Sequence, residues 1–161
     1  MLPNILYFKH FNKKNANLVI VLSKLTELNT ITLPFETSKI LKNKNIVNNL
    51  NEKEYAETSI ESHELQTYFD VKIFIIEKND ISAIAAGSKL YIKFDNKSKK
   101  DISFVFSDYL INRKDSLSSN FIFGFLMRSF SFLKYKNKKI IFIPKSLSIY
   151  SKNNRKLKNL E

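Results

Sequence analysis

The sequence predicts an α/β protein whose sheet is mixed, largely parallel and flanked by helices. Between residues 71 and 143 the apolar pattern alternates strand, helix, strand, helix, strand, with units close to the roughly 30 residues of a β-α-β unit. Residues 18–22 read Leu-Val-Ile-Val-Leu, a continuous apolar run typical of a strand that is covered on both faces. The length of 161 residues and the 43% content of hydrophobic residues suit one domain with a substantial core. Strands joined by helical crossovers are expected to lie parallel to their neighbours.

The first half of the chain is expected to supply two strands and one helix. Residues 4–11 read as a strand that begins after Pro3, where a missing N–H does least harm. We expect this strand to pair with the one at residues 18–22, which should lie centrally in the sheet. From residue 34 to residue 50 the apolar side chains follow helical spacing, but several asparagines interrupt it. We therefore expect one short helix near Ser38.

The first helix of the second half follows a buried type of strand at residues 71–76. Asn79 or Asp80 is suited to cap this helix, because a short polar side chain can accept a hydrogen bond from a free backbone N–H of the first turn. Small side chains in the helix would let it lie close to a sheet or to a second helix; these are Ala83, Ala85, Ala86 and Gly87. The predicted buried face comprises Ile81, Ile84, Ala85, Ser88 and Ile92.

A strand at residues 102–106 leads into a second helix, which Ser118 or Ser119 is suited to cap. Glycine in a helix interior costs about 0.5–1 kcal/mol relative to alanine, so Gly124 indicates close approach by a neighbouring backbone or a bulky Phe. The alternative is a glycine retained by tolerated drift. A last strand is expected at residues 140–143, which Pro144 either ends or confines to an edge of the sheet. The predicted buried face of the helix comprises Ile122, Phe125, Leu126, Ser129 and Leu133.

The predicted domain organisation is simple. Residues 1–150 are expected to form a single α/β domain. Residues 151–161 are polar and basic and lack an apolar period, so they are expected to be a tail or the start of a linker.

The charge of the chain is strongly basic, with 27 basic and 15 acidic residues and a formal net charge of +12. Only three of the basic residues are arginine, the side chain that nucleic-acid-binding proteins use for bidentate contacts to phosphate and guanine. Lys, Asn and Ile are the residue types that an adenine- and thymine-rich coding sequence enriches. Compositional drift therefore accounts for the charge without a ligand.

Several kinds of site and segment are excluded by the residue types present. The chain has no cysteine, so it has neither a disulfide framework nor a thiolate metal site. Its two glycines, Gly87 and Gly124, lie too far apart for a phosphate-binding loop. The apolar stretch at residues 121–127 is shorter than the roughly 18 residues that cross a bilayer. Residues 1–14 carry basic side chains where a signal peptide has its apolar segment, so a cytoplasmic protein without a membrane partner is expected.

Potential metal ligands are most dense between residues 52 and 64. That segment has a poor apolar pattern, and we expect a solvated loop or an edge of the sheet there. His10 follows a strand and is typical of a surface or packing residue. No motif of a serine hydrolase or a zinc peptidase occurs, so no catalytic, cofactor-binding or metal-binding residue is assigned and no cofactor is expected in this chain. The dense group comprises Glu52, Glu54, Glu57, Glu61, His63 and Glu64.

Residues 124–139 read G-F-L-M-R-S-F-S-F-L-K-Y-K-N-K-K. This segment resembles the end of the amino-terminal domain of the leucyl aminopeptidase (cytosol aminopeptidase) family, where a helix finishes as G-x-x-L-x-S-Y-x-F-x-x-Y-K-x-K-K. The resemblance covers about residues 70–140 and, more loosely, residues 15–70. Phe130 replaces the usual Tyr, and Leu133 replaces a frequent Asp. The matching positions are Gly124, Ser129, Phe132, Tyr135, Lys136, Lys138 and Lys139.

The resemblance implies a macro-domain-like α/β fold and a non-catalytic role in assembly and access. In the family, two divalent metals (Zn or Mn) and the catalytic residues belong to a carboxyl-terminal domain, whose N-T-D-A-E-G-R signature does not occur here. The implied partners are such a catalytic domain and further copies of the chain in a homo-oligomer. The Gly-Leu-Gly turn that usually follows the family's middle strand is replaced by Glu77-Lys78-Asn79, so no ligand role is carried over to it.

Other interpretations of the same features stay open. Lysines at the end of a helix also suit its dipole, which favours cations there without any further function. A stand-alone basic module that binds nucleic acid weakly and non-specifically would use Tyr and Phe for stacking between lysines. A binder of ADP-ribose would follow from fold analogy alone and lacks the glycines of a phosphate loop.

Overall fold

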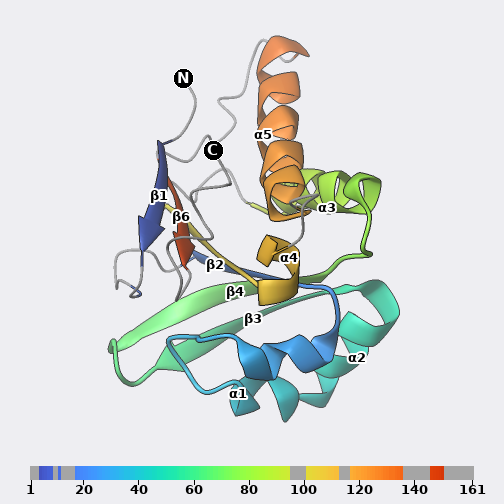
Figure 1. Cartoon of the computed structure of the whole chain (residues 1–161). Helices are drawn as coiled ribbons and strands as arrows, with labels where there is room; N and C mark the ends of the chain where they lie inside the picture. The colour runs from blue at the N-terminus through green and yellow to red at the C-terminus, as the bar shows by residue number, and fades with distance from the viewer. Residues whose placement is uncertain are drawn as a thin grey trace.

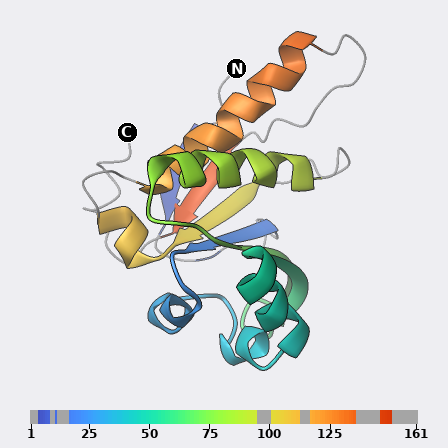
Figure 2. The same ribbon diagram turned by 90° about the vertical axis from the view of Figure 1, so that its right-hand side faces the viewer.

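The computed structural model describes residues 4–8, 11, 17–94, 101–112, 117–135 and 146–150, which form three layers. A six-stranded sheet lies in the middle, with α3 and α5 over one face and α1 and α2 over the other (Figures 1 and 2). The predicted α/β class is confirmed. The strands are β1 (Asn4–Phe8), β2 (Asn17–Leu22), β3 (Tyr55–Ser62), β4 (Thr67–Ile75), β5 (Ile102–Phe106) and β6 (Ser146–Tyr150). The helices are η1 (Leu25–Thr30), α1 (Ser38–Leu41), α2 (Lys44–Lys53), α3 (Asp80–Lys93), α4 (Asp108–Asn112) and α5 (Leu117–Tyr135).

The strand order is β1-β6-β5-β2-β4-β3, and all neighbours are parallel except β3 and β4. β2 lies between β4 and β5, as its continuous apolar run predicts. The prediction that β1 pairs with β2 is wrong, because β1 pairs with β6, where Ile5 lies opposite Leu147. The short separation of β1 and β2 in sequence favours pairing between them. The parallel sheet instead places the last described strand between β1 and β5.

The buried side chains of β2 divide between the two faces of the sheet. Leu18, Ile20 and Leu22 contribute to the core below η1, α1 and α2. Val19 and Val21 contribute to the core below α3, α4 and α5. All five side chains have no exposed surface, which is why the run lacks the polar alternation of a half-exposed strand.

Two helices occupy the segment where one was expected near Ser38. α1 covers that position, and α2 follows it after a single turn. Asn43 caps α2, since its side chain accepts hydrogen bonds from the backbone N–H groups of Asn45 (3.1 Å) and Ile46 (3.3 Å). The asparagine that interrupts the apolar pattern is therefore the start signal of a second helix. α2 ends at Lys53 and is capped by Glu54, whose backbone is left-handed with φ 57°.

β3 and β4 form an antiparallel hairpin at the edge of the sheet. β3 was not predicted as a strand, although an edge was one of the two expectations for this acidic segment. Ala56 and Ile60 are buried in the core below α1 and α2, and Ser62 is buried at the end of the strand. Glu57, which follows Ala56, is exposed. The alternation was hard to see because only two of the inward residues are apolar.

α3 begins after Asn79, whose side chain accepts a 2.8 Å hydrogen bond from the Ser82 N–H, so the predicted cap is confirmed. The predicted buried face is only partly correct: Ile84 and Ser88 are half-buried against α5, whereas Ala85 is exposed. Ile81 and Ile92 are 82% and 59% exposed, and the buried residues are Ala83, Gly87, Leu90 and Tyr91. Because α3 lies in backbone contact with α5, the face of α3 that carries its small residues is the buried one. Ile81 and Ile92 lie on the exposed face.

α5 begins at Leu117, so Ser118 and Ser119 lie inside its first turn and the prediction that one of them caps it is wrong. Ile122, Phe125 and Ser129 are buried as predicted, and Leu126 is half-buried. The side chain of Leu133, the strand expected at residues 140–143 and the tail at residues 151–161 lie outside what the structure describes. The division at residue 150 stays a prediction.

Candidate functional site

Helices α3 and α5 cross on one face of the sheet (Figure 2). Both glycines of the chain lie at this crossing. A Cβ atom on Gly87 would overlap the carbonyl oxygen of Phe121 and lie 2.9 Å from the amide nitrogen of Phe125. A Cβ atom on Gly124 would overlap the carbonyl oxygen of Ile84 and lie 2.8 Å from its carbonyl carbon. The two helices are therefore in backbone contact, which only glycine permits at these positions. The close approach predicted for Gly124 is confirmed.

A hydrogen bond reinforces the same crossing. The hydroxyl of Ser88 on α3 donates to the carbonyl oxygen of Gly124 on α5 at 3.1 Å. At the end of the crossing, the amide of Asn120 donates to the carboxylate of Asp80 at 2.8 Å. These two hydrogen bonds fix the position of α3 along the axis of α5. Apolar packing alone would define this position less sharply.

The predicted signature residues are only partly placed by the structure. Gly124 lies at the helix crossing, and the buried Ser129 donates a hydrogen bond to the carbonyl oxygen of Leu126 within its own helix at 2.6 Å. Phe132 and Tyr135 belong to the last turns of α5, and their side chains are outside what is described. Lys136, Lys138 and Lys139 lie outside the described residues.

A buried carboxylate lies at the carboxyl ends of β2 and β5, the edge where α/β proteins commonly place ligands. Glu27 of η1 accepts hydrogen bonds from the backbone N–H of Ser23 (2.8 Å) and from the Ser23 hydroxyl. Burial alone would raise the pKa of Glu27, but these bonds and the nearby Ser107 hydroxyl outweigh burial, so its pKa lies below the ordinary value of 4.5.

The arrangement around Glu27 is that of a structural turn. Glu27 is 8% exposed, and its carboxylate closes the loop that follows β2, much as a capping side chain closes a helix end. A carboxylate held in its charged form by donors is a poor proton acceptor. Sequence reasoning missed this residue; the only signal was an acidic side chain soon after a buried strand.

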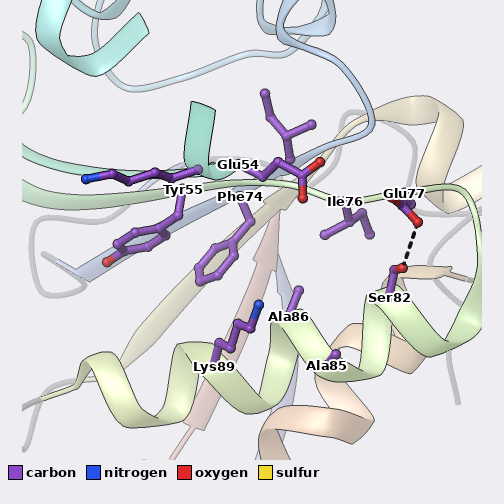
Figure 3. A pocket seen from close by; sticks show the side chains of 11 residues that line it. Glu54, Tyr55, Phe74, Ile76, Glu77, Ser82, Ala85, Ala86 and Lys89 are labelled. Carbon is purple, nitrogen blue, oxygen red and sulfur yellow. Dashed lines mark hydrogen bonds between the residues drawn. The ribbon is translucent and has the colours of Figure 1, made fainter. Parts of the chain in front are cut away.

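A pocket of about 170 Å³ opens between the hairpin and α3 (Figure 3). Its apolar lining includes Phe74 and Ile76 from the end of β4 and Ala86 from α3. Its charged lining includes two carboxylates and two ammonium groups, which belong to Glu54, Glu77, Lys53 and Lys89. Of the dense acidic group considered for metal binding, Glu54 alone contributes to this pocket.

The described residues do not assemble a metal site or a membrane span. No group of three or more acidic, His or Cys side chains among them could hold a metal ion. In the acidic segment, His63 and Glu61 approach each other to 4.0 Å as an exposed pair. Within the same part of the chain, none of the helices combines the length and hydropathy that crossing a membrane requires.

Comparison with solved structures shows what the layers and the helix crossing resemble. The fold is similar to part of a leucine aminopeptidase. A point mutant of the tomato enzyme aligns with 99% of this chain at a TM-score of 0.59 and 11% sequence identity. This chain spans only 36% of that enzyme's length. Comparison with protein-family models and with curated proteins found no match.

The similarity to leucine aminopeptidase is one of fold. At 11% identity it bears on the arrangement of strands and helices and says nothing about individual site residues. It agrees with the resemblance that the sequence shows around Gly124, which was found from different evidence. The part of the chain that is described thus has an aminopeptidase-like α/β architecture.

Proposed function

We propose that this chain is a non-catalytic domain equivalent to the amino-terminal domain of a leucyl aminopeptidase-like metallopeptidase. The single observation that carries the proposal is the fold similarity, which extends over 99% of this chain but only 36% of the tomato enzyme. The Gly124 segment supports it independently, because the glycine that the sequence matches to the family is the one that α5 needs at its crossing with α3.

The residues present do not fit the two divalent metals that the family resemblance implies. A two-metal peptidase site requires several carboxylates or imidazoles around each ion. The described residues bring no such group together. In this proposal the metals and the peptidase chemistry belong to a catalytic domain that is not part of this chain.

A role in assembly would require a contact surface, and α5 offers the best candidate. Phe123 and Met127 are 51% and 47% exposed and lie one turn apart on the same face of the helix. Exposed large apolar side chains that lie together mark contact surfaces more often than single ones do. We therefore assign the outer face of α5 to contacts within the assembly.

Sedimentation velocity and a peptidase assay on the purified chain test the proposal. We expect no hydrolysis of aminoacyl substrates with added Zn²⁺ or Mn²⁺, and a concentration-dependent oligomer. The double variant Phe123→Lys with Met127→Lys should shift the chain toward monomer. Tyr68→Lys is the matched control, because Tyr68 is also exposed (64%) but lies on β4. Turnover that is abolished by mutating this chain would overturn the non-catalytic role. A monomer at all concentrations would overturn self-assembly through α5.

A further inference from the structure

Glu54 and Lys89 point into the pocket from opposite sides and leave its centre open (Figure 3). Glu54 follows the end of α2, and Lys89 belongs to α3. The two side chains do not form an ion pair with each other. Among the described residues neither has a hydrogen-bond or ion-pair partner, although an unpaired acid and an unpaired base face the same small space.

Two neighbouring lysines outside the pocket lining, Lys72 and Lys93, have partners. Lys72 lies 3.9 Å from the carboxylate of Glu57, and Lys93 lies over the ring of Tyr55 at 4.7 Å. The phenol of Tyr55 donates to Glu57 at 2.7 Å, so that carboxylate is also engaged. Lys53 and Lys89, the two lysines of the pocket lining, have no such partner among the described residues.

The backbone holds Glu54 in place. Its N–H donates to the carbonyl oxygen of Leu50 at 3.1 Å, and its carbonyl oxygen accepts from the N–H of Ile75 at 2.9 Å. Its left-handed conformation is one that helices usually give to Gly or Asn. The backbone of Glu54 is therefore held in place, and its carboxylate lies at the edge of the pocket.

The other carboxylate of the pocket, that of Glu77, is engaged through one of its two oxygens. Glu77 accepts hydrogen bonds at 3.2 Å from the side chains of Asn79 and Ser82 (Figure 3 shows the second). Both bonds are to Oε2 of Glu77, whereas neither carboxylate oxygen of Glu54 has a donor among the described residues. Between Glu54 and Lys89 the floor is apolar, formed by Phe74 and Ile76, which are 4% and 3% exposed.

We propose that this pocket binds a small zwitterion, a free amino acid whose ammonium group binds Glu54 and whose carboxylate binds Lys89. The lining carries two acidic and two basic side chains, so a ligand without net charge suits it better than a phosphate or a polyamine. The apolar floor accepts the aliphatic part of the ligand. The volume of about 170 Å³ is smaller than the roughly 300–1,000 Å³ of sites for larger ligands, so it admits one amino acid.

Nitrogen-15 NMR titration of the whole chain tests the proposal. The probes are L-leucine and 6-aminohexanoate, two zwitterions that differ in the separation of their charges. The comparison compounds are 3-methylbutylamine and 4-methylpentanoate, each of which keeps one charge of leucine. We expect saturable shifts at the amides of Glu77, Ser82 and Ala86 with at least one zwitterion. Each singly charged compound should bind at least about tenfold more weakly, since it loses one charged hydrogen bond.

Variants then assign the two charges. Glu54→Gln and Lys89→Gln should each weaken binding of the zwitterion at least about tenfold. Both side chains are exposed, and unchanged spectra away from the pocket would show that the fold is intact. The matched controls are Glu52→Gln and Lys42→Gln, which change the same charges at exposed positions outside the pocket and should leave binding unchanged.

Three results would overturn the inference. The first is the absence of saturable shifts at the pocket amides with both zwitterions up to their solubility limits. The second is equal binding of leucine and its singly charged analogues, and the third is equal binding by Lys89→Gln and Lys42→Gln. Because the third result needs only the lysine variants, loss of folding in Glu54→Gln would not prevent a decision.

Discussion

Gly87 and Gly124 lie at one helix crossing, where each faces the backbone of the opposite helix. Gly87 contacts the turn of α5 that contains Phe121, and Gly124 contacts Ile84 of α3. The arrangement is reciprocal, since each helix supplies the glycine that the other needs. It fixes α3 and α5 as one unit over the sheet, and it explains why a chain with only two glycines keeps both inside helices.

Substitution of Gly124 by alanine should destabilise the protein. The new Cβ atom meets backbone of α3, which cannot move as a flexible side chain can, so the crossing must open. We expect a loss of about 1–3 kcal/mol in the free energy of unfolding, measured by urea melts followed by circular dichroism. At an exposed helical site the same change would gain about 1 kcal/mol. A more stable Gly124→Ala variant would contradict the close approach.

The exposed Ala85 on α3 provides the control for helix propensity. Ala85→Gly should cost about 1 kcal/mol, because it adds backbone freedom without touching α5. Gly87→Ala should lower the free energy of unfolding, as Gly124→Ala should, although helix propensity alone predicts an increase for both. If both glycine variants follow propensity instead, the helices do not meet as described.

Two phenylalanines in α5 distinguish core from surface. Phe125 has no exposed surface and lies edge-on to the rings of Tyr91 (5.6 Å) and Phe104 (6.3 Å). Phe125→Ala should cost about 3–5 kcal/mol. Phe123→Ala, the matched control in the same helix, should change the stability of the monomer by no more than about 0.5 kcal/mol. Equal costs in urea melts would contradict the assigned faces of α5.

Glu27 should make stability depend on pH in the acid range. Its pKa in the folded protein lies below the ordinary value of 4.5, so its contribution is fully present above about pH 4.5 and is lost as the pH falls through the folded-state pKa. Glu27→Gln should therefore cost more stability at pH 7 than at pH 3. Urea melts at both values measure this difference. A cost that is the same at both pH values would show that the charge of Glu27 does not matter.

Binding to polynucleotides should be weak and independent of sequence if the lysine excess reflects compositional drift. Its affinity should fall steeply with salt, since each phosphate contact releases condensed counterions. Fluorescence anisotropy with mixed-sequence and homopolymeric single strands at several salt concentrations measures both properties. Sub-micromolar, sequence-selective binding near physiological salt would instead favour the nucleic-acid-binding module.

Local sequence patterns predicted those parts of the fold that depend on residues close together in the chain. The apolar run of β2 predicted a central strand, Asn79 predicted the start of α3, and Gly124 predicted a close backbone contact. Pairing between distant segments was beyond such signals. Nothing near β1 indicates that its partner is β6, more than a hundred residues away.

The site features were harder to predict than the strands. Ile81 and Ile92 fit a helical stripe, yet they are exposed because Gly87 sets which side of α3 meets α5. The pocket combines Glu54, which ends a helix, with Lys89, which lies 35 positions later in another. Their proximity follows from the hairpin between them, and its first strand carried too few apolar residues to be predicted.

Association with a catalytic domain tests the central claim most directly. The measurement is sedimentation velocity of this chain mixed with the catalytic domain of a leucyl aminopeptidase from the same source organism, with dipeptide hydrolysis followed in parallel. We expect a stoichiometric complex, a change in hydrolysis on complex formation, and loss of the complex with Phe123→Lys and Met127→Lys. Two components that sediment independently at all concentrations, with hydrolysis unchanged, would contradict the account.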